Sequence, residues 1–213
     1  MAAKLVPAVK TNYTLNQLVR GLVEGWYKKF GALPKKESIA VLYAQNAIET
    51  GSTVAMWNNN VGNVKFSPSK NPDNDTGKDY MMLNNVWEII NGQKVIFQPP
   101  NKQTWFRSFP TLGDGIADHY EFLMNHRYKT AWASVENGNP AEFAHQLKKA
   151  GYYTAPEADY IKLMNLYFNK FMKATTFETV AVELTPVPTP DIPVVEEKKS
   201  VNIFDIISKV FKK

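Results

Sequence analysis

The 213-residue chain contains no cysteine, which excludes disulfide bonds, thiolate metal ligands and a cysteine nucleophile. It also lacks any apolar stretch near the ~20 residues that a membrane-spanning helix needs. The N-terminal sequence, MAAKLVPAVKTNYT, has no apolar core of the kind that a secretory signal peptide contains. The histidines, His119, His126 and His145, do not have metal-ligand spacing with any acid, and no serine nucleophile motif is present. We therefore predict neither a metal site nor a cofactor.

A lysine- and arginine-rich block is missing as well, although the chain is basic overall. It has 25 Lys and Arg against 20 Asp and Glu, a formal net charge of +5 and a pI of about 9.2. A basic balance favours acidic partners such as nucleic acid, anionic lipid or a bacterial wall rich in carboxylates. Because the sequence contains no zinc or nucleic-acid motif, we do not predict a nucleic-acid partner.

The composition is that of a globular protein, with 44% hydrophobic and 13% aromatic residues. A capping-box pattern from Thr14 to Gln17 opens a run of apolar residues at helical spacing, which predicts a helix over 14–30. Pro34 suits the first turn of a second helix that reaches Thr50. Similar patterns predict further helices at 112–125, 128–135, 140–150 and 157–173.

A β-hairpin is predicted between the second and third helices. Val86–Ile90 and Lys94–Gln98 are apolar runs on either side of Asn91-Gly92, the dipeptide that most strongly indicates a tight hairpin turn. We expect Gln103–Phe109 to add a third short strand. The fold class is therefore predicted as α+β, mainly helical with a small β-hairpin lobe.

The composition changes after about residue 176. Residues 183–197 contain four prolines and no aromatic residue, which is typical of an extended spacer. Val201–Lys213, which follows Ser200, is predicted to be a short, basic, amphipathic helix. Such a helix could lie on an anionic membrane, dock in a groove of a protein partner, or pack back on its own domain. The predicted organisation is a leader (1–13), a main domain (14–175), a linker (176–199) and a terminal helix (200–213).

The stretch Ser38–Lys65 carries the residues with the clearest chemical meaning. Its helix ends at Glu49, with Thr50 and Gly51 following, so the carboxyl lies in the last helical turn. The negative end of the helix dipole and partial burial both raise the pKa of such a carboxyl, which can then hold a proton near neutral pH. The aromatic Trp57 and an asparagine-rich turn come next. An acid, an aromatic ring and side-chain amides close together are typical of a site that binds and cleaves a sugar polymer.

Several blocks along the chain resemble one enzyme family. Residues 44–65, AQNAIETG…MWNNNVGNVK, are similar to the signature of glycoside hydrolase family 73, the lysozyme-like peptidoglycan glucosaminidases. Glu88–Gly92 matches the spacing of the Glu-x-x-Asn-Gly hairpin in that family. Trp105–Phe109 resembles its Phe-Arg-x-Tyr segment, and Ala150–Tyr160 resembles its Ala-Gly-Tyr-Ala-Thr-Asp-Pro-x-Tyr motif. The blocks cover roughly residues 38–172, and the resemblance implies a lysozyme-like fold.

The resemblance also implies roles for individual residues. Glu49 would be the general acid, Glu88 the second carboxylate and Tyr152 an active-site tyrosine. In a glycosidase one acid protonates the leaving oxygen, while the other activates water or stabilises the positive charge that develops on the sugar. For the tyrosines, packing in the aromatic core is the alternative. The residues expected to bind substrate are Trp57, Asn59, Asn60, Tyr153 and Tyr160.

We therefore predict hydrolysis of the β-1,4 bond between N-acetylglucosamine and N-acetylmuramic acid in peptidoglycan. A muramidase or a lytic transglycosylase, which cleaves the other β-1,4 bond, is the first alternative. An inactive glycan-binding or structural virion module is the second. Because no signal peptide is recognised, we expect the protein to be made in the cytoplasm and to act on the bacterial cell wall as a phage lysin or virion protein.

Overall fold

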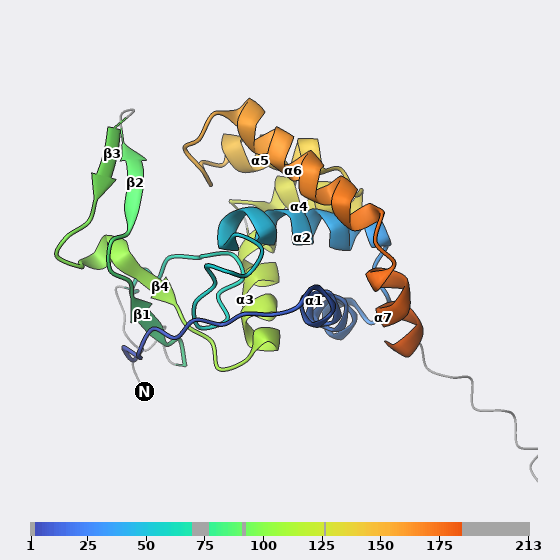
Figure 1. Cartoon of the computed structure of the whole chain (residues 1–213), viewed down its shortest axis with the longest axis horizontal. Coiled ribbons are helices and arrows are strands. Elements are labelled where there is room, and N and C mark those ends of the chain that lie inside the picture. The colour runs from blue at the N-terminus through green and yellow to red at the C-terminus, as the bar shows by residue number, and fades with distance from the viewer. Residues whose placement is uncertain (1–2, 70–76, 91–92, 126, 185–213) are drawn as a thin grey trace, which may run out of the picture.

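The computed structural model describes residues 3–69, 77–90, 93–125 and 127–184, with helices and strands at opposite ends of the molecule (Figure 1). The elements are α1 (Leu15–Phe30), α2 (Lys36–Thr50), β1 (Tyr80–Met82), β2 (Trp87–Ile90), β3 (Gln93–Ile96), the 3₁₀ turn η2 (Lys102–Thr104), β4 (Trp105–Arg107), α3 (Leu112–Met124), α4 (Lys129–Glu136), α5 (Pro140–Lys149), α6 (Glu157–Met172) and α7 (Thr176–Leu184). The predicted α+β class, mainly helical with a small β lobe, is confirmed. None of the described helices has the length and apolarity that a membrane crossing requires.

Helix α1 begins and ends where the sequence predicts. The Thr14 hydroxyl accepts a hydrogen bond from the backbone N–H of Gln17, and the Gln17 side chain accepts one from the backbone N–H of Thr14. This capping box satisfies two of the N–H groups that a helix start leaves unpaired. Gly31 ends the helix with a left-handed φ of 71°.

Helix α2 lies at the centre of the helical bundle and packs against α1, α4, α5 and α6 (Figure 1). Residues 38–47 are all buried, as expected for a helix that has neighbours on every side. The helix begins at Lys36, so Pro34 precedes the N-cap residue Lys35 and is not in the first turn as predicted. Gly51, with a φ of 58°, ends it as predicted. Because α2 packs against neighbours on every side, the core holds the residues of its last turn in place.

The strands of the described residues form two separate two-stranded sheets. Strands β2 and β3 are the predicted hairpin, whose turn residues, 91–92, lie outside the described residues. The third short strand predicted within 103–109 is present as β4, but it pairs antiparallel with β1 and not with the hairpin. Met81 and Phe106 are partners in this pairing and are both buried, and Phe66 stacks on Tyr80 at 4.6 Å between ring centroids. Burial of this apolar face explains the pairing.

The predicted leader is part of the folded domain. The backbone N–H of Val6 donates to the carbonyl of Tyr80, and the N–H of Asn58 donates to the carbonyl of Val9. The Tyr13 hydroxyl donates to the side-chain oxygen of Asn59 at 2.6 Å. Residues 3–13 thus run along the strands and the loop after α2 before they enter α1 (Figure 1).

The predicted linker at 176–199 begins instead as helix α7, which packs against α1. Val180 is only 3% exposed, and two ion pairs join α7 to the bundle, Lys36 with Glu178 and Arg20 with Glu183. The rest of the predicted linker and the predicted helix at 200–213 lie outside the described residues.

Candidate active site

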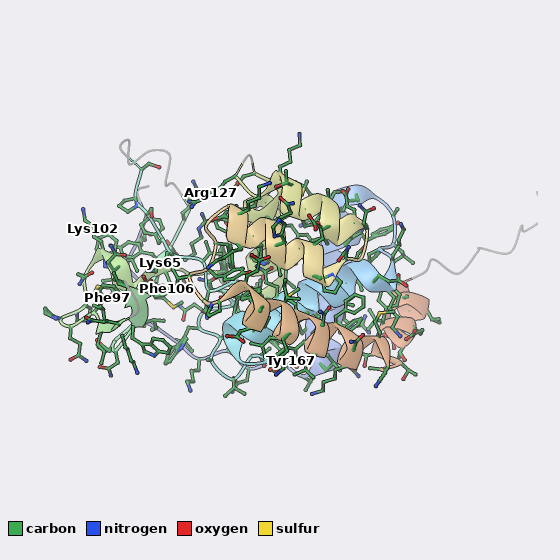
Figure 2. The ribbon with its side chains drawn as sticks, turned by 90° about the horizontal axis from the view of Figure 1, so that it is seen from above. Lys65, Phe97, Lys102, Phe106, Arg127 and Tyr167 are labelled. Atoms are coloured by element: carbon green, nitrogen blue, oxygen red, sulfur yellow. The ribbon has the colours of Figure 1, made fainter. Side chains whose placement is uncertain are left out.

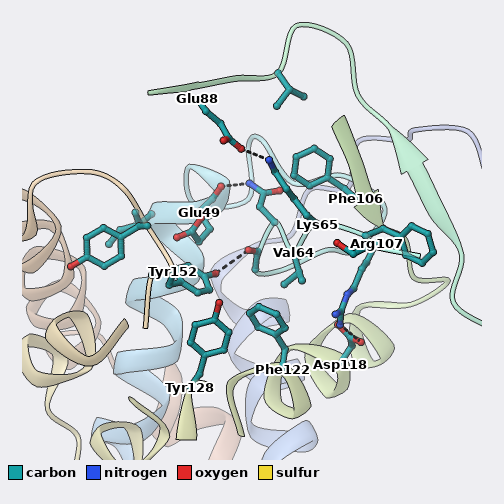
Figure 3. A pocket seen from close by; sticks show the side chains of 18 of the residues that line it. Glu49, Val64, Lys65, Glu88, Phe106, Arg107, Asp118, Phe122, Tyr128 and Tyr152 are labelled. Atoms are coloured by element: carbon teal, nitrogen blue, oxygen red, sulfur yellow. Dashed lines mark hydrogen bonds and ion pairs between the residues drawn. The ribbon is translucent and has the colours of Figure 1, made fainter. Parts of the chain in front are cut away.

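A cleft of about 1050 Å³ lies between the hairpin and the helices. Its walls come from the end of α2, the loop at 62–69, strands β2 and β4, helix α3, and the segment from 151 into α6 (Figure 3). Glu49 lies on the helical wall and Glu88 on the hairpin wall. The structure thus brings both predicted carboxyl groups to one cavity.

Glu49 occupies the position that the sequence predicts, in the last turn of α2. Burial raises the pKa of its carboxyl from 4.5 to about 7, and a hydrogen bond from Tyr160 opposes part of this rise. The direction agrees with the prediction, and burial is the leading cause. The Asn63 side chain donates to the backbone carbonyl of Glu49, which ties the end of α2 to the following loop (Figure 3). Because the pKa of Glu49 is about 7, a substantial share of its carboxyl groups is protonated at neutral pH.

Tyr160 contacts the carboxyl group of this acid directly. Its hydroxyl donates to Oε1 of Glu49 at 3.0 Å, and its ring stacks on Tyr153 with centroids 3.9 Å apart. Burial raises the pKa of the Tyr160 hydroxyl well above its usual range, and the nearby Glu49 charge raises it further. Tyr160 therefore remains a donor at any pH at which Glu49 titrates. The sequence predicted it as a substrate-binding residue and did not predict this hydrogen bond.

Tyr152 and Tyr153 also line the cleft, but neither phenol bonds to Glu49. The Tyr152 hydroxyl donates to the carbonyl of Gly62 at 3.1 Å (Figure 3), and the Tyr153 hydroxyl donates to the carbonyl of Ala144 at 3.0 Å. Burial, followed by the Glu49 charge, raises the pKa of Tyr152 well above its usual range. Tyr152 thus joins the loop after α2 to the segment before α6.

Three residues predicted to bind substrate do not line the cleft. The Asn60 amide donates to the carbonyls of Val64 and Arg107, and its oxygen accepts from the N–H of Val64. Asn59 accepts from Tyr13 and donates to a backbone carbonyl, and Trp57 lies against the leader. Buried backbone groups in a tight loop need partners, and the two amides supply them. Binding of substrate by these three residues stays a prediction.

Glu88 lies on β2, half-buried, and forms an ion pair with Lys65 across the cleft (Figure 3). Lys65 comes from the loop after α2 and its backbone bridges to Phe106 of β4, so this pair joins the hairpin to that loop. The ε-ammonium of Lys65 also lies 5.7 Å from the centroid of the Phe97 ring. The sequence identified Lys65 only as part of the family signature. Its charge, opposite to that of the second acid, was the signal that could have predicted the pair.

A second charge pair and a buried polar pair complete the site. Nη1 of Arg107 bonds to both carboxylate oxygens of Asp118, at 2.7 and 2.8 Å. Nε2 of His119 lies 3.0 Å from the side-chain oxygen of Gln45, and burial lowers the pKa of His119 to about 4. His119 is thus a buried, neutral residue, and its Nδ1 has no hydrogen-bond partner among the described residues. In the described residues no group of three His, Asp or Glu side chains could hold a metal ion.

The fold has a counterpart among solved structures. The crystal structure of a peptidoglycan hydrolase mutant from Sphingomonas sp. A1 matches with a TM-score of 0.51 and 17% identity, covering 79% of this chain and 99% of that one. The glycoside hydrolase domain of FlgJ from Salmonella typhimurium has a TM-score of 0.45 and 18% identity, covering 82% and 100%. The catalytic domain of the autolysin Auto from Listeria monocytogenes has a TM-score of 0.46 and 16% identity, covering 80% and 90%.

No curated protein sequence matches the chain significantly. A family model does: residues 34–173 match Glucosaminidase, described as mannosyl-glycoprotein endo-beta-N-acetylglucosaminidase. That range contains the helix end with Glu49, the hairpin with Glu88 and the segment with Tyr160, and it coincides with the blocks that carried the resemblance. The resemblance to glycoside hydrolase family 73 is confirmed, and the chain belongs to the glucosaminidase family of glycoside hydrolases.

Proposed function

We propose that this endo-β-N-acetylglucosaminidase cleaves a β-1,4 bond of peptidoglycan, with Glu49 as the general acid. The observation that carries the proposal is the carboxyl of Glu49, which lines the cleft, has a pKa of about 7 and is held by Tyr160. A general acid works best when its pKa lies near the pH at which the enzyme operates. The Sphingomonas structure is that of a peptidoglycan hydrolase, which supports the choice of polymer.

In the proposed reaction Glu49 transfers its proton to the glycosidic oxygen as the bond from that oxygen to C1 breaks. The positive charge that develops on the sugar is met by water, by the acetamide of the substrate, or by a carboxylate. Glu88 is the candidate for the carboxylate because it lines the same cleft. One of its oxygens accepts a hydrogen bond from Lys65, and this contact must be released before that oxygen can activate water.

The test uses purified peptidoglycan, wild-type protein and Glu49→Gln. Fragments are reduced with borohydride and identified by mass spectrometry, which labels each new reducing end. Glu142→Gln is the matched control, because it removes an exposed carboxylate from α5 that does not line the cleft. We expect reduced glucosamine ends with the wild type and the control, and about a hundredfold or greater loss with Glu49→Gln, as is typical of removing acid catalysis.

Other outcomes would change the assignment. Reduced muramic ends would indicate a muramidase, and anhydro-muramic ends would indicate a lytic transglycosylase, which needs a single acid. Full activity of Glu49→Gln would overturn the role of Glu49. No fragments from folded wild-type protein would favour an inactive glycan-binding or structural virion module.

The place of action and the role of Val201–Lys213 stay predictions from the sequence. We propose action on the bacterial wall, by a lysin released from the cell or carried in a virion, with the terminal segment contacting an anionic membrane or a protein partner. Sedimentation of the full chain with vesicles containing anionic lipid, compared with a chain ending at 199, tests the membrane contact. Equal sedimentation of the two chains would argue against it.

A further inference from the structure

The cationic side chains along the cleft differ in what they contact. Lys65 is paired with Glu88, and Arg107 is paired with Asp118. Arg127 also lines the cleft, but its Nε donates to the backbone carbonyl of Ala150 at 2.8 Å, and it forms no ion pair with a described carboxylate. In Figure 2 it lies at the edge of the helical bundle that faces the strands.

The guanidinium of Arg127 is held in place by its surroundings. It lies over the ring of Tyr128, 5.5 Å from the centroid, and against Gly151, where an added Cβ would come within 3.0 Å of Nη2. Gly151 has a φ of 71°, so a glycine both permits the turn and leaves room for the guanidinium. Because Nε is already bonded, the Nη1 and Nη2 groups remain as a fixed pair of donors.

A fixed pair of guanidinium donors matches the two oxygens of a carboxylate. Peptidoglycan offers such groups, because its stem peptides carry acidic residues and because a muramic acid residue without a stem peptide has a free lactyl carboxylate. A neutral oligomer of N-acetylglucosamine offers none. We propose that Arg127 binds a carboxylate of the glycan strand and so makes the cleft selective for acidic over neutral glycans; this rests on the proposed peptidoglycan substrate.

Binding measurements test this without catalysis. Glu49→Gln serves as the parent, so that no probe is cleaved, and Arg127→Gln or Arg127→Lys is added to it. Lys129→Gln is the matched control, because Lys129 is an exposed cation two residues away that does not line the cleft. The probes are an N-acetylglucosamine oligomer, glycan strands stripped of peptides by an amidase, and strands with intact stem peptides.

We expect Arg127→Gln to weaken binding of a carboxylate-bearing probe about tenfold, as for the loss of a charge-assisted pair, and to leave the neutral oligomer within twofold. Arg127→Lys keeps the charge but not the fork, and should fall between the two. Loss with the stripped strands identifies the lactyl carboxylate, and loss only with intact strands identifies the stem peptide. The Lys129→Gln control should bind all probes like the parent.

Equal binding of all probes by the parent and Arg127→Gln would overturn the proposal. So would an equal loss for every probe, since that would point to a structural role for Arg127 beside Gly151. Thermal unfolding of each variant checks the fold. Failure of the proposed function is recognised separately, because wild-type protein would then release no fragments from peptidoglycan whether or not Arg127 affects binding.

Discussion

Replacement of Tyr160 by phenylalanine should shift the pH dependence of catalysis. The hydrogen bond from Tyr160 to Glu49 favours the ionised carboxyl and lowers its pKa, which burial sets at about 7 overall. A hydrogen bond to a charged group is worth about 1.5–3 kcal/mol, and one pH unit corresponds to about 1.4 kcal/mol. Because water in the cleft replaces part of the lost bond, we expect the pKa of Glu49 to rise by about one pH unit.

The sign of the shift follows from the role of the acid. Glu49 must be protonated to act, so its pKa sets the basic limb of the profile of kcat/KM against pH. In Tyr160→Phe this limb should move to higher pH, although the ring and its stacking on Tyr153 are kept. Tyr153→Phe is the control, because it removes a hydroxyl that bonds to Ala144 and should leave the limb in place. A basic limb that stays fixed or moves to lower pH in Tyr160→Phe would refute this reasoning.

Three further predictions concern stability. The pKa of Glu49 in the folded state is about 7, above the ordinary 4.5, so ionisation of its carboxyl destabilises the fold as the pH rises from 4.5 through 7. Glu49→Gln should therefore raise the free energy of unfolding by up to about 3 kcal/mol at pH 8 and hardly at pH 4. Urea titration at the two pH values measures this difference. Gly62→Ala would place a Cβ 2.3 Å from Nδ1 of the buried His119, and thermal unfolding should show a loss of about 1–3 kcal/mol. Val180→Ala should cost about 1–2 kcal/mol if α7 is part of the domain, and nothing if the segment is a free linker.

The parts of the fold that the sequence predicts well depend on local signals. The Thr14 capping box and Gly51 mark helix ends through contacts within a few residues. The pairing of β1 with β4 and the docking of α7 on α1 depend on residues far apart in the chain, and no local pattern encodes them. The proline-rich composition after α7 indicated a linker from residue 176 onward, so this helix was not predicted.

In the candidate site, too, some features follow from local sequence signals and others depend on tertiary packing. Glu49 follows from its helix and its glycine, whereas the choice between Tyr152 and Tyr160 as its partner depends on how α6 crosses α2. Both tyrosines belong to one motif, and only packing decides which phenol reaches the carboxyl. An asparagine-rich loop beside an acid suits a sugar on composition alone. In the structure the side chains of Asn59 and Asn60 form hydrogen bonds with backbone carbonyls and with the Tyr13 phenol.

The two acids are held by parts of the chain that differ in rigidity. Glu49 ends a helix that is buried among four others, so the core fixes its position and its desolvation together. Glu88 lies on a two-stranded hairpin whose Trp87 and Ile96 are each 54% exposed, and such a hairpin has little stability of its own. Its ion pair with Lys65 joins Glu88 to the loop that follows α2. The core therefore sets the pKa of Glu49, whereas the distance between the two carboxyl groups depends on the hairpin and on its contact with Lys65.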